Sequence, residues 1–177
     1  MSLSMSKLLC SLLFLPIAAV GLAVSAQAND LILPGRCHMG QCWENKFLGK
    51  TPLQAGPNGT LYAVELALRI WPIGTEPSSD FDAPRTSYIY CSTTRPAIIF
   101  RFEGDTTYYG NLLNPGGDNW SGATQDAYPI YWATCHNFVG PDFFSQAMTT
   151  KAIELGYPLN LPNESLQLAN PLEIMNE

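Results

Sequence analysis

The amino-acid sequence predicts an α+β fold, made mainly of an antiparallel β-sheet with one C-terminal helix and two disulfides. Three observations favour this class: one long run of alternating apolar residues, several short aromatic and β-branched runs between turns, and a single helical pattern near the C-terminus. A sheet closed into a barrel, or split into a sandwich, is the alternative architecture.

The strongest periodicity lies in Leu61–Trp71, where apolar side chains at the even positions alternate with smaller or charged ones. A period of two is typical of a half-buried strand. A helix is the alternative for a run so rich in alanine and leucine, but Glu65 and Arg69 would then lie within its apolar stripe. We therefore expect a strand.

Two further strands are expected at Thr86–Cys91 and Ala97–Glu103, separated by a segment whose Pro96 cannot donate to a sheet ladder. Gly104-Asp105 fits a two-residue turn of type II′, with glycine at its first central position. The resulting hairpin register places Phe102 opposite Thr107, Phe100 opposite Tyr109, and Arg101 opposite Tyr108.

The C-terminal third is expected to hold one more strand and the helix. The aromatic run Tyr128–Phe138 is predicted as a strand, because aromatic residues suit a pleated, half-buried surface. Asp142 can cap a helix over Phe143–Leu155, which the following glycine and proline would end. The tail after Pro158 is expected to wrap the surface, with at most a short turn around Ser165–Ala169.

Residues 1–28 have the pattern of a secretory signal peptide. Lys7 precedes an apolar run, and Ser25-Ala26-Gln27-Ala28 supplies the small residues that signal peptidase accepts. A membrane anchor is the alternative, but the apolar run is short for a bilayer, which needs about 20 residues. We expect cleavage after Ala28, one disulfide-stabilised domain at 29–177, and no membrane span in it.

Composition excludes several classes of protein. Of the 177 residues, 46% are hydrophobic, which argues against intrinsic disorder. Loss of residues 1–28 removes one of nine basic residues and none of fifteen acidic ones, leaving a formal charge of −7. A nucleic-acid-binding protein would need a basic face, so no nucleic-acid partner is expected.

Four cysteines remain after residue 28, namely Cys37, Cys42, Cys91 and Cys135. An even number in an exported chain predicts two disulfides, with three pairings open. Both histidines, His38 and His136, directly follow a cysteine, so a zinc site or a catalytic thiol is the alternative. The cysteine spacing does not match common zinc motifs, and we expect no metal and no cofactor.

Aromatic and acidic residues are the remaining functional signal. Tyr and Trp are favoured at binding surfaces because they are large, rigid and amphipathic, although half-buried strands use them equally well. The predicted binding residues, mainly in loops, are Asp80, Asp82, Glu103, Asp105, Tyr108, Tyr109, Asp118, Trp120 and Tyr131. The aromatic members of this set are expected to be exposed. Paired carboxylates for glycoside hydrolysis are the best catalytic alternative, with candidates Glu65, Glu103, Asp105, Asp118 and Asp126.

Three motifs surround the cysteines: Cys37-His38-Met39-Gly40-Gln41-Cys42-Trp43, then Tyr88-Ile89-Tyr90-Cys91-Ser92 with Arg95-Pro96-Ala97, and then Tyr131-Trp132-Ala133-Thr134-Cys135-His136. Together they resemble those of small exported proteins of Gram-negative bacteria. The resemblance implies that the four cysteines belong to one framework, and it supplies no catalytic residues.

These observations predict a periplasmic or secreted binding protein without catalytic activity of its own. Cell-wall-lytic enzymes and toxins are often basic, and a chain of charge −7 would attract them by electrostatic steering, so an inhibitor or immunity protein is the favoured form. A cell-wall glycan hydrolase and a structural envelope component are the alternatives.

Overall fold

Seven antiparallel strands form one sheet, in which each strand pairs with the next along the chain. The computed structural model describes residues 31–117, 122, 124–140 and 143–176. The strands are β1 (Leu31–His38), β2 (Gln41–Gly56), β3 (Gly59–Pro72), β4 (Arg85–Cys91), β5 (Ala97–Phe100), β6 (Tyr108–Leu112) and β7 (Ser165–Leu168). The helices are α1 (Ala127–His136), α2 (Gln146–Glu154) and the 3₁₀ helix η1 (Pro171–Met175). The predicted α+β class with a mainly antiparallel sheet is confirmed.

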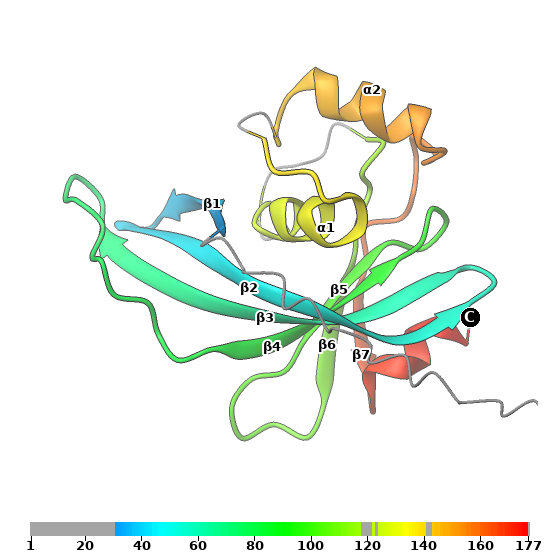
Figure 1. Ribbon diagram of the computed structural model, residues 1–177, viewed down its shortest axis with the longest axis horizontal. Helices are drawn as coiled ribbons and strands as arrows, with labels where there is room; N and C mark the ends of the chain where they lie inside the picture. The colour runs from blue at the N-terminus through cyan, green and yellow to red at the C-terminus, as the bar shows by residue number, and fades with distance from the viewer. Residues whose placement is uncertain (1–30, 118–121, 123, 141–142, 177) are drawn as a thin grey trace, which may run out of the picture.

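The sheet curves around α1, which lies on its concave face, and α2 lies on the side of α1 away from the sheet (Figure 1). The main core fills the space between sheet and helices, and Leu33, Val64 and Ile89 meet Tyr131 and Trp132 there. A second core lies on the opposite face, where η1 covers β3 and β4. None of the helices in the described part of the chain is long and apolar enough to cross a bilayer.

The predicted strands at Leu61–Trp71 and Thr86–Cys91 are confirmed as β3 and β4. Val64 and Leu66 of the predicted apolar face are buried against the helices. Leu61, on the other face, is buried as well, because η1 packs there. The alternation therefore predicted the strand, but not that both of its faces would be covered at one end.

The β5–β6 hairpin keeps the predicted register, with Phe100 opposite Tyr109. The ladder stops there, however, and Arg101–Thr107 forms a longer connection than the predicted two-residue turn. Within it, the Asp105 amide donates to the Phe102 carbonyl at 3.1 Å, and Gly104 has φ +85° at the second central position of the turn.

The predicted strand at Tyr128–Phe138 is wrong, because this segment forms α1. Nearly all of its residues are buried, so the segment is apolar around its whole circumference and shows neither helical nor strand alternation. Pro129 lies in the first turn, where its missing N–H would have had no partner within the helix. Tertiary burial thus overrides the β-propensity of the aromatic residues.

The C-terminal tail is also more ordered than predicted. It adds β7 to the free edge of β6, with Gly110 opposite Leu166, and then forms η1. The predicted C-terminal helix is present as α2, which begins after Ser145, while the expected cap Asp142 lies outside the described residues.

The N-terminal hairpin β1–β2 carries the first disulfide, between Cys37 and Cys42. Met39 and Gly40 both have positive φ, as a tight two-residue hairpin turn requires. Gly35 lies at a bulge in β1, where a Cβ atom would come 1.8 Å from the Trp43 carbonyl oxygen. The second disulfide joins Cys91, at the end of β4, to Cys135 of α1, so the open pairing is resolved and the two predicted disulfides are confirmed.

Candidate functional site

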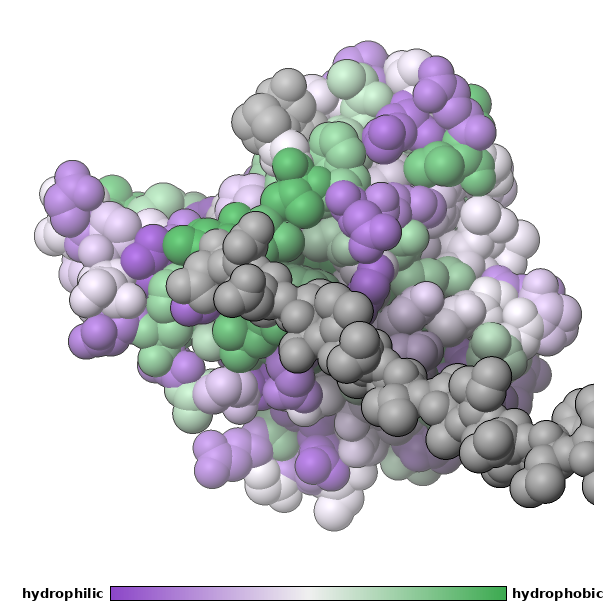
Figure 2. Space-filling model, viewed as in Figure 1, coloured by the Kyte–Doolittle hydropathy of each residue, from purple (hydrophilic) through white to green (hydrophobic). Residues whose placement is uncertain are grey.

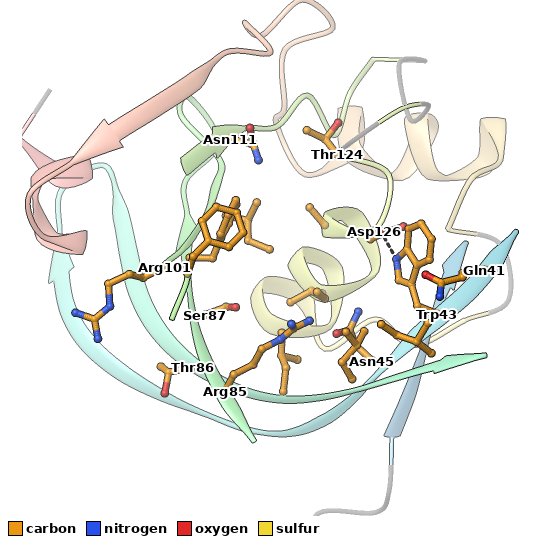
Figure 3. A pocket seen from close by; sticks show the side chains of 18 residues that line it. Gln41, Trp43, Asn45, Arg85, Thr86, Ser87, Arg101, Asn111, Thr124 and Asp126 are labelled. Carbon is orange, nitrogen blue, oxygen red and sulfur yellow. Dashed lines mark hydrogen bonds between the residues drawn. The ribbon is translucent and has the colours of Figure 1, made fainter. Parts of the chain in front are cut away.

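A cavity of about 510 Å³ lies between the concave face of the sheet and the N-terminal half of α1 (Figure 3). Cross-strand partners share a face of a sheet, so the register determines which side chains line it. Asn45 pairs with Leu68 and Trp43 with Ile70, while Leu66 pairs with Arg85. The cavity exists because α1 covers only part of the apolar face predicted for β3.

The walls of the cavity are mainly apolar. Its apolar lining comprises Leu66, Leu68, Ile70, Ile98, Phe100, Phe102, Ala127 and Ile130. Two of these remain strongly exposed, since Ile70 is 47% exposed and Phe102 59% exposed. Figure 2 shows apolar side chains gathered where the strands meet α1. A volume within the usual range for ligand sites, about 300–1,000 Å³, and an apolar lining suit a small organic molecule.

Polar side chains from several elements interrupt this lining. Asn45 is 4% exposed, and its Oδ1 atom has no hydrogen-bond partner among the described residues. Arg85 and Ser87 stand two residues apart on β4 and point into the cavity beside it (Figure 3). The side chain of neither residue makes a hydrogen bond to another described residue. The cavity therefore offers a guanidinium, a hydroxyl and an amide to whatever occupies it.

Asp126 closes one end of the cavity. Its Oδ2 atom accepts a hydrogen bond from Trp43 Nε1 at 2.6 Å and lies 3.5 Å from Arg36 Nε. The Arg36 guanidinium also lies over the Trp43 ring and donates to the Gly122 carbonyl at 2.6 Å. Burial raises the pKa of Asp126, and the Trp43 N–H and the Arg36 charge lower it in part. This corner holds the start of α1 against the β1–β2 hairpin.

A second hollow of about 820 Å³ adjoins the cavity and brings together four of the predicted binding residues, Asp82, Glu103, Asp105 and Tyr108. Arg85 and Arg101 line it as well, so it is not uniformly acidic. The Arg101 guanidinium stacks over the Tyr108 ring at 5.0 Å. This hollow is polar, in contrast to the apolar cavity beside it.

The other predicted binding residues lie apart from this hollow. Asp80 is exposed but does not line it, and Tyr109 lines a smaller hollow beside Phe100 and Phe102. Asp118 and Trp120 lie outside the described residues. The expectation that Tyr131 is exposed is wrong: it is fully buried on α1, because the segment is a core helix and not a surface strand.

Those candidate carboxylates that the structure describes do not form one pair beside the apolar cavity. Glu65 is exposed on the other face of β3, where it accepts a hydrogen bond from Thr86 Oγ1 at 2.6 Å. Glu103 and Asp105 line the second hollow, and Asp126 lines the apolar cavity. Among the described residues that line the apolar cavity, Asp126 is the one carboxylate.

The four cysteines are joined in disulfides, so their sulfur atoms are not available as thiolates. His136 instead takes part in a hydrogen-bonded chain, with its Nε2 atom 2.7 Å from the Tyr157 hydroxyl. In the part of the chain that the structure describes, no three His, Cys, Asp or Glu side chains are grouped as metal ligands would be.

Sequence reasoning missed most polar residues of the cavity, among them Asn45, Arg85 and Ser87. The signal that could have found them is alternation, because Arg85 and Ser87 lie two apart on β4. That signal becomes specific only once the register with β3 is known. Comparison of the chain with family models, with curated proteins and with solved structures found no match.

Proposed function

We propose that this chain is an exported binding protein, and that its ligand is a small, mainly apolar molecule held in the cavity between the sheet and α1. The observation that carries the proposal is the cavity of about 510 Å³, whose largely apolar wall is interrupted by polar side chains such as Arg85 and Ser87 (Figure 3). Ligand sites in proteins are typically clefts of this size, lined by apolar side chains with a small number of polar groups that orient the ligand.

Binding is favoured over glycan hydrolysis by the arrangement of the carboxylates. A glycosidase needs two carboxyl groups, about 5–9.5 Å apart, on either side of the scissile bond. Asp126 stands without a second acid among the described residues that line the cavity, and Trp43 and Arg36 already occupy its Oδ2 atom. This lining supports holding a molecule more than cleaving one.

Export is supported by the sequence pattern of residues 1–28 together with the two disulfides. Disulfides persist in oxidising compartments such as the periplasm and the extracellular space. A protein in either place would meet small apolar molecules outside the cytoplasm.

The proposal is tested with N-phenyl-1-naphthylamine, a neutral apolar dye whose fluorescence rises in apolar sites. We expect the purified protein to raise the dye's fluorescence with a single-site isotherm. Leu68→Trp fills the cavity and should abolish the rise, whereas Ile153→Trp, at a 49% exposed position on α2, should leave it unchanged. Equal fluorescence with both variants would place the dye elsewhere and overturn the proposal.

A second candidate function is binding of a basic protein, for which the convergence of Asp82, Glu103 and Asp105 on one hollow is the specific observation. We propose that these carboxylates would steer a basic wall-lytic enzyme toward the hollow. The association rate should then fall steeply as salt rises from 50 to about 500 mM, because screening shortens the range of the attraction. A rate that does not depend on salt would remove this candidate.

A further inference from the structure

We propose that the ligand of the apolar cavity carries one anionic group, a carboxylate or a group of similar geometry, and that Arg85 binds it. The inference rests on the proposed function and adds the chemical class of the ligand. It makes the ligand an amphiphile, with an apolar body on the cavity wall and a charged head at Arg85.

The position of Arg85 follows from the sheet register. Arg85 pairs with Leu66, and Leu66 lies on the concave face that α1 covers. Ser87, two residues further along β4, is on the same face. In Figure 3 the Arg85 side chain extends toward the middle of the cavity, between Ser87 and Asn45. The guanidinium therefore has a hydroxyl and an amide as neighbours, which together can surround a small anionic head.

The Arg85 guanidinium has no close partner among the described residues. Its side chain forms no hydrogen bond and no ion pair with any of them. Partial burial lowers the pKa of its guanidinium, and the more distant Asp82 carboxylate raises it in part. A guanidinium in partly apolar surroundings gains more from a bound anion than one in open water, because the local dielectric constant is lower.

Arg101 provides the contrast. Arg101 lines both the apolar cavity and the second hollow. Its guanidinium, however, points away from the apolar cavity (Figure 3) and stacks on the Tyr108 ring. Of the two arginines, only Arg85 faces the space where an apolar ligand would lie.

The apolar body has a continuous surface to occupy. Leu66 and Leu68 of β3, Ile98 of β5 and Ile130 of α1 line the cavity on the sheet and helix sides. An unbranched alkyl chain attached to a carboxylate matches this arrangement, since its tail would cover the leucines and isoleucines while its head stays at Arg85, which is exposed to solvent on one side.

The experiment measures displacement of N-phenyl-1-naphthylamine by three ligands of equal chain length: decanoate, 1-decanol and decylamine, all below their micellar concentrations. We expect decanoate to bind the wild-type protein at least about tenfold more tightly than decanol, as one charge-assisted hydrogen bond would provide, and decylamine to bind most weakly. Arg85→Gln should abolish the preference for decanoate while keeping dye and decanol binding, and Arg101→Gln should retain the preference.

The outcomes separate the two proposals. If the dye does not bind in the cavity, the proposed function fails. If the dye binds but decanoate and decanol displace it equally from the wild-type protein, only the anionic ligand class is overturned. If the preference persists in Arg85→Gln, the assignment to Arg85 is overturned. Dye binding by Arg85→Gln also reports that the variant is folded.

Discussion

Substitution of Tyr157 by phenylalanine tests how the segment after α2 is held against α1. The Tyr157 hydroxyl lies 2.8 Å from the Tyr131 hydroxyl and 2.7 Å from His136 Nε2, and the Tyr131 hydroxyl donates to the Ser92 carbonyl at 3.0 Å. Each hydroxyl has one proton. All three bonds can form only if His136 Nε2–H donates to Tyr157, Tyr157 donates to Tyr131, and Tyr131 donates to Ser92. Burial raises the pKa of Tyr157 to about 12, so its hydroxyl keeps this proton at neutral pH.

The cost of Tyr157→Phe follows from this chain. The variant loses two hydrogen bonds, each worth about 1 kcal/mol net, and leaves the His136 N–H without its acceptor. His136 is half-buried, so water can satisfy its N–H in part. The free energy of unfolding should therefore fall by about 2 kcal/mol, a sizeable part of the 5–15 kcal/mol typical of domains.

Urea unfolding of the oxidised protein measures this change. Trp132, which is 1% exposed and lies 6.1 Å from the Tyr157 ring, is a suitable fluorescent reporter. With an m-value of about 2 kcal/mol per molar urea, the midpoint should drop by roughly 1 M. Tyr62→Phe is the matched control, because this half-buried hydroxyl makes no hydrogen bond to a described residue. Its midpoint should not move.

Two results would refute the reasoning. Equal midpoints for Tyr157→Phe and the wild-type protein would mean that the hydroxyl chain contributes nothing to stability. An equal loss in Tyr157→Phe and Tyr62→Phe would mean that the effect does not depend on the buried chain.

Two further predictions concern acid stability and the disulfides. Burial, followed by Lys151 and Lys50, lowers the pKa of His136, so the folded state disfavours the charged ring. Stability should be full above about pH 6.5, the unfolded value, and fall as pH drops toward the lowered folded-state pKa. His136→Gln should flatten this slope in urea titrations, and an unchanged slope in this variant would contradict the assignment to His136. Loop-closure entropy scales with the separation of the cysteines, which is 44 residues for Cys91–Cys135 and 5 for Cys37–Cys42. Double alanine variants should therefore lose about 4 and about 2 kcal/mol respectively, measured by the same unfolding assay, and the reverse order would contradict the entropic account.

Local sequence patterns predicted those features of the sheet that depend on residues close together in the chain. Alternation identified β3, and the predicted hairpin register placed Phe100 opposite Tyr109, although the connection is longer than the predicted two-residue turn. The even number of cysteines predicted two disulfides, although not which partners they join. Side-chain period and turn preference depend on residues that are neighbours in the chain, so these features can be read from a single sequence.

The same reasoning failed where burial on another element decides the structure. The aromatic composition of residues 128–138 suits a strand as well as a buried helix, and only the concave sheet that covers this segment makes it a helix. The expected exposure of Tyr131 was wrong for the same reason. It assumed a strand at the surface, whereas Tyr131 is buried on α1.

The sequence by itself determined the α+β class, the central antiparallel strands and the presence of two cross-links. Only the tertiary structure decided which part of the apolar face of β3 is covered by α1 and which part lines a cavity with Asn45, Arg85 and Ser87. The physical reason is that a cavity is the space between elements far apart in the chain. Its size and lining depend on where a helix comes to rest on a curved sheet, and that position results from the summed packing of many distant residues.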